Sequence, residues 1–181
     1  MQKESTPSPV ARALLTTCPC ATTQALLDHG NAVDQPLAQA AEEPAEEESP
    51  TPRRRTALVI DDTGAHRHVA TSLLKRFDFD VEQAIHGLQG LEMMIEKRFD
   101  VVLCDYEMPE LDGFACVSEF RQWEHEHRPQ HKKQPVVCFT GSLEQRSGIA
   151  AQGLEAGMDL VVAKPYSRAK LEKALEQVQM L

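Results

Sequence analysis

Two short apolar stretches that each end in aspartate decide the fold of this chain. Residues 56–62 read TALVIDD, and residues 101–105 read VVLCD. An unbroken apolar run of this length, bounded by polar residues, is typical of a strand that is buried on both faces of a parallel sheet. We therefore expect a parallel sheet with acidic residues at the carboxyl ends of at least two strands.

The rest of the chain from residue 56 onward repeats this pattern. Further strands are predicted around Val81, over residues 136–139 and over residues 160–163. Segments of helical period lie between the strands, and residues 143–156 form a helical segment weakened by two glycines. The apolar faces of the other helices are Val69, Leu73, Leu74 and Phe77; Leu88, Leu91 and Ile95; Phe114, Val117 and Phe120; and Leu171, Ala174, Leu175 and Val178. Five strands that alternate with five helices indicate an α/β fold with a doubly wound parallel sheet and right-handed crossovers.

Residues 1–55 are predicted to be a disordered, acidic, proline-rich tail, and residues 56–181 a single domain. The tail region holds seven of the eleven prolines, and residues 1–52 contain eight acidic and two basic residues, which is six of the nine net negative charges. Such a segment buries too little apolar surface to offset the entropy of ordering it. Its Ser/Thr-rich first thirty residues leave an organelle transit peptide open as an alternative.

The charge distribution argues against two classes of partner. The domain carries only three of the net negative charges and has no basic stripe, so we expect no direct nucleic-acid binding. No apolar run approaches the roughly 20 residues that span a bilayer, so we expect no membrane insertion. Arg53, Arg54 and Arg55 form the one basic run, interpreted as a solvated junction before a strand rather than a nuclear signal. The expected location is cytoplasmic, with a nuclear or organellar one open.

The five cysteines indicate a reducing compartment and no disulfide framework. Cys104 and Cys138 lie in apolar runs and are expected to be buried, and Cys116 lies in a helical stretch. Cys18 and Cys20 resemble a redox or metal pair, but no second pair with ligand spacing follows them.

Histidines give weaker metal signals. Three of them, His125, His127 and His131, lie within Glu124–Lys133, which we interpret as a solvated polar insertion because no acidic or cysteine partner completes a site. His66 and His68 are expected to be exposed first-turn helix residues. Trp123 is expected to pack in a helix or to contact a partner.

The polar residues at the strand ends form the candidate site. Asp61 and Asp62 end the first strand, Asp105 the third, Thr140 the fourth, and Lys164 follows the fifth. In an open parallel sheet, ligands bind at these carboxyl ends. Three carboxylates together require a cation, and an all-oxygen set suits Mg²⁺. With metal and ammonium present, Asp105 can act as a nucleophile toward phosphorus. A single Asp at a strand end can equally be a turn or helix-capping residue.

In combination these residues resemble the receiver domain of two-component signalling. The matching motifs are Asp61-Asp62, the stretch DYEMPELDG at residues 105–113, Thr140-Gly141 and Lys164-Pro165. The similarity extends over residues 56–181. It implies a flavodoxin-like fold with five strands in the order 2-1-3-4-5. Residues 156–159, AGMD, are similar to receivers attached to hybrid histidine kinases.

The resemblance also implies roles for individual residues. Asp105 would be the phosphoacceptor, with Thr140 and Lys164 holding the phosphoryl oxygens. Asp62, Asp105 and the backbone carbonyl of Glu107 would bind Mg²⁺ directly, and Asp61 would bind it through water. A cis peptide bond is expected before Pro165.

The chain departs from the family pattern at two positions. Val161 stands where the family usually has an aromatic residue that moves inward on phosphorylation, and Gly141 replaces the commoner alanine. The valine predicts a weaker coupling between Thr140 and the surface of the fourth helix. The glycine predicts a site more open to solvent.

The favoured hypothesis is a stand-alone phosphoacceptor, not an enzyme, that acts through binding. Its expected partners are a histidine kinase or histidine phosphotransfer protein, and a downstream protein that contacts the fourth helix, fifth strand and fifth helix. One alternative is a phosphatase with an Asp nucleophile, but Asp61-Asp62-Thr63-Gly64 lacks a second acid at the required spacing. Another is an interaction module with an inactive site.

Overall fold

The computed structural model describes residues 53–141 and 148–180. Strands and helices alternate through this part of the chain. The strands are β1 (Arg55–Ile60), β2 (Phe79–Ala84), β3 (Val101–Asp105), β4 (Val136–Thr140) and β5 (Leu160–Ala163). The helices are α2 (Gly64–Lys75), α3 (Gly87–Glu96), α4 (Gly113–His127), α5 (Ile149–Glu155) and α6 (Arg168–Gln177).

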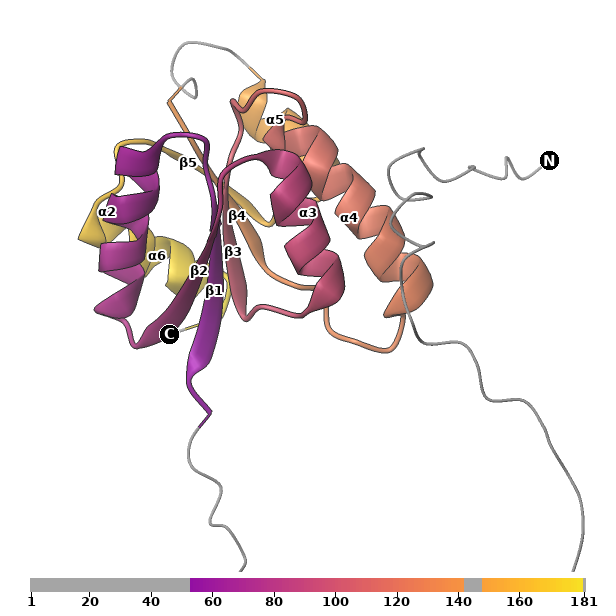
Figure 1. Ribbon diagram of the computed structural model, residues 1–181, viewed down its shortest axis with the longest axis horizontal. Coiled ribbons are helices and arrows are strands. Elements are labelled where there is room, and N and C mark those ends of the chain that lie inside the picture. The colour runs from indigo at the N-terminus through magenta and orange to yellow at the C-terminus, as the bar shows by residue number, and fades with distance from the viewer. Residues whose placement is uncertain (1–52, 142–147, 181) are drawn as a thin grey trace, which may run out of the picture.

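All strand pairs are parallel, and the sheet order is β2-β1-β3-β4-β5. The predicted fold class and strand order are therefore confirmed. The helices form two layers, with α2 and α6 on one face of the sheet and α3, α4 and α5 on the other (Figure 1). The carboxyl ends of the strands lie together at the upper edge in this view.

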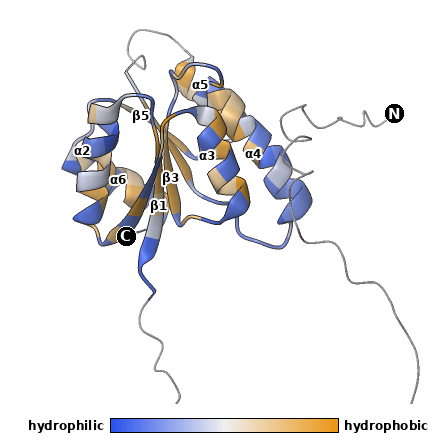
Figure 2. Cartoon of the chain, in the orientation of Figure 1, coloured by the Kyte–Doolittle hydropathy of each residue, from blue (hydrophilic) through white to orange (hydrophobic). Residues whose placement is uncertain are grey.

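Two apolar cores fill the spaces between the sheet and the helix layers. Leu58 and Ile60 of β1 point into the core under α3 and α4, whereas Ala57 and Val59 point into the core under α2 and α6. This is why the middle parts of the central strands β1, β3 and β4 are continuously apolar, as the hydropathy colouring shows (Figure 2). The outer faces of the helices are polar in the same view.

Several helix predictions need correction. Val69 is not part of the buried face of α2, because it is 43% exposed; the buried residues there are Ala70, Thr71 and Leu74. The segment Glu124–Lys133 is not a solvated insertion throughout, because α4 continues to His127 and Glu124 is buried. The Glu124 carboxylate accepts hydrogen bonds from Arg121 and from the backbone N–H of Gln134.

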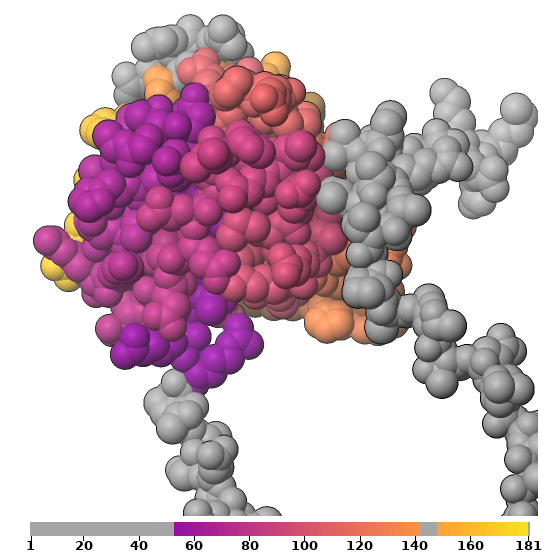
Figure 3. Space-filling view, viewed as in Figure 1, coloured from indigo at the N-terminus to yellow at the C-terminus, as the bar shows by residue number. Residues whose placement is uncertain are grey.

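The first described residues belong partly to the sheet. Arg55 begins β1, and its guanidinium donates hydrogen bonds to the carbonyl oxygens of Phe77 and Met180. Arg53 and Arg54 are exposed and pair with Asp100 and Asp80. Together with α2, β2 and α3, this part of the chain forms much of the surface that faces the viewer in Figure 3. The predicted tail up to residue 52, with Cys18 and Cys20, lies outside the described residues.

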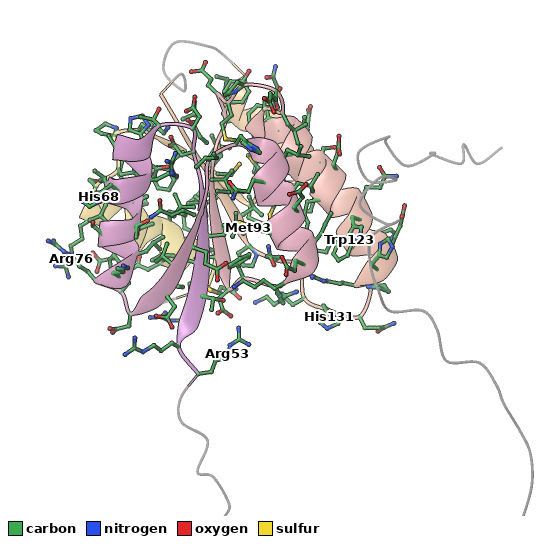
Figure 4. The ribbon with its side chains drawn as sticks, viewed as in Figure 1. Arg53, His68, Arg76, Met93, Trp123 and His131 are labelled. Carbon is green, nitrogen blue, oxygen red and sulfur yellow. The ribbon has the colours of Figure 1, made fainter. Side chains whose placement is uncertain are left out.

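Other buried positions agree with the sequence. Cys104, Cys116 and Cys138 are fully buried, and Trp123 packs at the margin of the core with the Arg128 guanidinium 4.7 Å from its ring centroid (Figure 4). Within residues 53–141 and 148–180, no helix is long and apolar enough to cross a bilayer.

Candidate phosphoryl-transfer site

The sheet order brings the predicted polar residues together. Asp61 follows β1, Asp105 ends the neighbouring β3, and Thr140 ends β4 beyond it. Asp61 and Thr140 have no exposed surface, and Asp105 is 5% exposed. Two buried carboxylates side by side would repel each other in a medium of low dielectric, so they require a positive partner.

Lys164 supplies that positive charge. Its Nζ atom lies 2.8 Å from Asp61 Oδ2 and 2.7 Å from Asp105 Oδ2. The predicted cis peptide bond between Lys164 and Pro165 is present, and the Lys164 backbone N–H donates to the carbonyl oxygen of Thr140 at 2.8 Å. The lysine is therefore fixed at both its backbone and its ammonium group.

The protonation of this pair follows from burial and charge. Burial raises the pKa of Asp105, although the hydrogen bond and the charge of Lys164 act in the opposite direction. Burial disfavours the charged form of Lys164, but its hydrogen bonds to Asp105 and Asp61 outweigh burial, so its pKa is raised. Lys164 thus remains an ammonium at neutral pH.

Asp61 is held by groups on three sides. Its Oδ1 atom accepts a hydrogen bond from the Thr63 backbone N–H at 2.9 Å. Its Oδ2 atom accepts from Lys164 and, at 3.4 Å, from the hydroxyl of Tyr166. Tyr166 is buried against Phe139, with ring centroids 4.6 Å apart, and burial raises the pKa of its phenol. Its hydroxyl therefore stays protonated and can donate.

The other predicted metal ligands lie at the rim of the site. Asp62 is exposed, and its Oδ1 atom accepts a hydrogen bond from the Thr63 hydroxyl at 3.2 Å. Glu107 is exposed two residues after Asp105. Gly141 is also exposed, and a Cβ atom built there would have nothing within 4 Å, which agrees with the expectation of an open site.

His66 lies in the first turn of α2, as expected, but it also contacts the site. Its side chain is 44% exposed, but its Nδ1 atom lies 3.1 Å from Lys164 Nζ and 3.4 Å from Asp61 Oδ1. His68 is exposed, as expected, on the outer surface of α2 (Figure 4). Sequence reasoning also missed Tyr166. Only the positions of these two residues in the sequence could have indicated that they belong to the site. His66 lies in the first turn of a helix that starts at the site, and Tyr166 follows Lys164-Pro165.

Gly113 places α4 against the phosphoacceptor strand. A Cβ atom at this position would lie 2.0 Å from the carbonyl oxygen of Asp105. The helix begins here with Asp112 as its N-cap, whose side chain accepts a hydrogen bond from the Ala115 backbone N–H at 2.8 Å. Glycine is thus required for the close approach between α4 and the end of β3.

Val161 occupies the position where an aromatic residue was expected from the resemblance. It packs at the edge of the core beside α5, and a Cβ atom on Gly153 would lie 2.7 Å from its Cγ2 atom. The small residue on the helix and the short branched side chain on β5 therefore fit each other.

The donor set fits a divalent cation. Asp61 and Asp105 share one ammonium group and Asp62 lies exposed at the rim, so the three carboxylates and the lysine together leave two formal negative charges at the edge of the sheet. Among the described residues, the ligand atoms that lie within 4.8 Å of one another come from Asp61, His66 and Asp105. The histidines of α4 and the following loop do not belong to such a group within the described part of the chain.

The structure is an α/β domain with a doubly wound parallel sheet. Buried carboxylates and a lysine at the carboxyl edge of the sheet are the arrangement expected of a domain that binds a phosphoryl group. Residues 57–176 match the response regulator receiver domain family. The chain belongs to this family, whose members serve as phosphoacceptors in two-component signalling.

Curated relatives place similar domains within larger signalling proteins. The chain is 33% identical over 126 residues to hybrid signal transduction histidine kinase E of Dictyostelium discoideum, which covers 69% of this chain and 7% of that protein. It is 32% identical over 119 residues to sensor histidine kinase CheAY of Helicobacter pylori, covering 65% of this chain and 14% of that protein. The chain therefore spans a small part of these relatives.

Solved structures agree in fold over nearly their whole length. Chemotaxis protein CheY4 of Vibrio cholerae is 27% identical, with a TM-score of 0.60 over 70% of this chain and 99% of that one. The receiver domain of sensor histidine kinase PA1611 from Pseudomonas aeruginosa is 26% identical, with a TM-score of 0.59 and the same coverage. That structure has a magnesium ion coordinated in its active-site cleft.

Proposed function

We propose that Asp105 is the phosphoacceptor of this receiver domain and takes its phosphoryl group from a phosphohistidine. A bond forms between a carboxylate oxygen of Asp105 and phosphorus while the bond from phosphorus to the imidazole nitrogen breaks, and the electron pair stays on the imidazole. The observation that carries this proposal is the 2.7 Å contact between buried Asp105 and Lys164. It places a nucleophile next to a fixed positive charge.

The surrounding residues take complementary parts. Lys164 and Thr140 would hold oxygens of the phosphoryl group, and Asp61, Asp62, Asp105 and the backbone carbonyl of Glu107 would hold Mg²⁺. Bound there, the metal would neutralise charge on the phosphoryl oxygens. Asp61 is kept in place for this role by the Thr63 backbone N–H and by Lys164.

The phosphorylated domain would act by binding and not by turning over a metabolite. The upstream partner would be a histidine kinase or histidine phosphotransfer protein, since several curated relatives are named as histidine kinases. The downstream partner would be a protein that contacts the surface of α5, β5 and α6. The acidic composition of the chain argues against nucleic-acid contact. The expected location is cytoplasmic.

Intact mass spectrometry tests the acceptor. The full chain is incubated with acetyl phosphate and Mg²⁺, and the wild type is expected to gain the mass of one phosphoryl group. Asp105→Asn should show no gain, because an amide does not form the acyl phosphate. Asp80→Asn is the matched control, since Asp80 is exposed on β2 away from the site. A wild type without any gain would support the inactive-module alternative, and a gain in Asp105→Asn would move the acceptor elsewhere.

A further inference from the structure

The Lys164 ammonium group lies among three acceptors that come from different parts of the fold. Its Nζ atom is 2.7 Å from Asp105 Oδ2, 2.8 Å from Asp61 Oδ2 and 3.1 Å from His66 Nδ1. An ammonium group has three N–H donors and no acceptor, so these three contacts satisfy it completely. Two of the acceptors belong to the site expected from the sequence, and the third, His66, was not expected there.

The direction of the hydrogen bond to His66 follows from the lysine. If Nδ1 carried a proton, two donors would face each other at 3.1 Å. Nδ1 is therefore the unprotonated nitrogen, and it accepts from Lys164. The Asp61 Oδ1 atom is farther from Nδ1, at 3.4 Å, and it already accepts from the Thr63 backbone N–H. The imidazole thus uses its lone pair for the ammonium group.

The surroundings of the imidazole hold it in this orientation. His66 lies in the first turn of α2, directly after the loop that carries Asp61 and Asp62. Its ring meets the ring of Tyr166 edge to face, with centroids 6.3 Å apart, and Tyr166 is buried against Phe139. The His66 side chain remains 44% exposed, so packing of the core does not explain a histidine at this position.

The three acceptors have different roles in the proposed phosphoryl transfer. An oxygen of Asp105 would form the bond to phosphorus, and Asp61 would become a ligand of Mg²⁺, so both would change their partners. His66 takes part in neither step. It is therefore the acceptor that can hold the ammonium group in one place during the transfer, while the other N–H groups turn to the phosphoryl oxygens.

We propose that His66 is a positioning residue for Lys164, with its Nδ1 atom anchoring the ammonium group beside the phosphoacceptor. This inference rests on the proposed function, because it uses Lys164 to hold phosphoryl oxygens. The lysine carries its charge on a flexible four-carbon stem, and without the third acceptor the ammonium group samples positions farther from Asp105. Loss of the anchor therefore slows phosphorylation, although His66 acts only through the lysine.

Two variants that differ only in the acceptor test this anchor. In His66→Asn the Oδ1 atom is attached to Cγ, as Nδ1 is in histidine, so an acceptor stays near the same place. His66→Leu has the same branching at Cγ and no acceptor. The full chain is incubated with acetyl phosphate and Mg²⁺, and its phosphorylation is followed by intact mass. We expect the rate to fall about tenfold in His66→Leu and to stay within about twofold of the wild type in His66→Asn.

The ammonium group can also be observed directly, without donor or metal. In a ¹H–¹⁵N correlation spectrum, the Lys164 ammonium signal is assigned by its loss in Lys164→Met. Its hydrogens should exchange slowly with water in the wild type and in His66→Asn, and at least about tenfold faster in His66→Leu. His68→Ala is the matched control, because His68 is exposed on the same helix, and it should behave as the wild type in both experiments.

Several results would overturn the proposal. One is an ammonium signal in His66→Leu that exchanges as slowly as in the wild type, and another is a wild-type signal that exchanges as fast as those of exposed lysines. Equal phosphorylation rates in His66→Leu and His66→Asn would do the same, because a merely structural role would affect both variants alike. A wild type that gains no phosphoryl group would count against the proposed function alone, since the ammonium spectrum still decides whether His66 holds Lys164.

Discussion

The ammonium nitrogen of Lys164 lies 2.7 Å from the Oδ2 atom of Asp105, although the two residues are far apart in the sequence. The contact exists because β3 and β5 end at the same edge of the sheet, and Lys164 follows β5 directly. Burial raises the pKa of Asp105, and the hydrogen bond and charge of Lys164 oppose that rise. The reactivity of Asp105 therefore depends on a residue outside its own strand.

Removing this ammonium should make Asp105 a weaker acid. In the wild type, burial already raises the pKa of Asp105 above its ordinary value of 3.8, and Lys164 limits the rise. In Lys164→Met the pKa of Asp105 should rise further, so the carboxylate is lost at a higher pH on acidification. Carboxyl ¹³C NMR in metal-free buffer measures this, with Lys173→Met on exposed α6 as the control. An unchanged titration in Lys164→Met would show that the contact has no electrostatic effect.

Asp62 should matter for Mg²⁺ despite its exposure. Asp62→Ala removes a carboxylate that the proposed site uses directly, and we expect the Mg²⁺ affinity to fall at least about tenfold. Titration calorimetry of Asp62→Ala against Asp80→Ala checks this. Equal affinities in the two variants would mean that Asp62 is not a ligand.

Gly113 should tolerate no side chain. In Gly113→Ala the new methyl group would meet the carbonyl oxygen of Asp105 at 2.0 Å, and the strand end or α4 must shift. We expect the free energy of unfolding to fall by about 1 to 3 kcal/mol. Gly141→Ala is the matched control, because its Cβ atom would meet nothing within 4 Å, and its stability should stay within about 0.5 kcal/mol. Urea unfolding of both variants compares them.

The amino-terminal region should be dispensable for the domain. Among the described residues, both cores are formed from Ala57 onward, so we expect deletion of residues 1–52 to leave the melting temperature and the phosphoryl mass gain unchanged. Differential scanning calorimetry and intact mass of the shortened chain test this. A melting temperature lower by several degrees would reveal docking of the tail on the domain.

The response to phosphorylation should appear in α5. Val161 lacks the volume of an aromatic ring, and α5 is a short helix that contains Gly153. We expect beryllofluoride with Mg²⁺ to change amide hydrogen exchange over Ile149–Glu155 more than in α2, α3 or α6. Uniform exchange with and without beryllofluoride across α5 would contradict this mode of signalling.

The sequence predicted the sheet well because burial on both faces leaves continuous apolar runs. The four clearest strands were placed within two residues of their observed bounds, because such a run can be recognised in the sequence alone. Asp61, Asp105, Thr140 and Lys164 followed from their positions at strand ends. The parts that sequence reasoning missed depend on rotation about a helix axis. Neighbouring residues of a helix point in different directions around its axis, and the apolar pattern of α2 does not show which of them faces the sheet. It therefore left open whether Val69 or Ala70 is buried and whether His66 faces the site.

Gly153 of α5 packs closely against the Val161 side chain of β5. This contact limits which residues can be substituted at position 161. An aromatic residue substituted at position 161 alone would be larger than the space that α5 leaves for the valine side chain. Introducing the aromatic residue that the family resemblance led us to expect at position 161 therefore requires changes in both β5 and α5. The helix must move away from the strand to make room for the larger side chain. Libraries that vary the two positions together are the appropriate starting point for changing what this surface recognises.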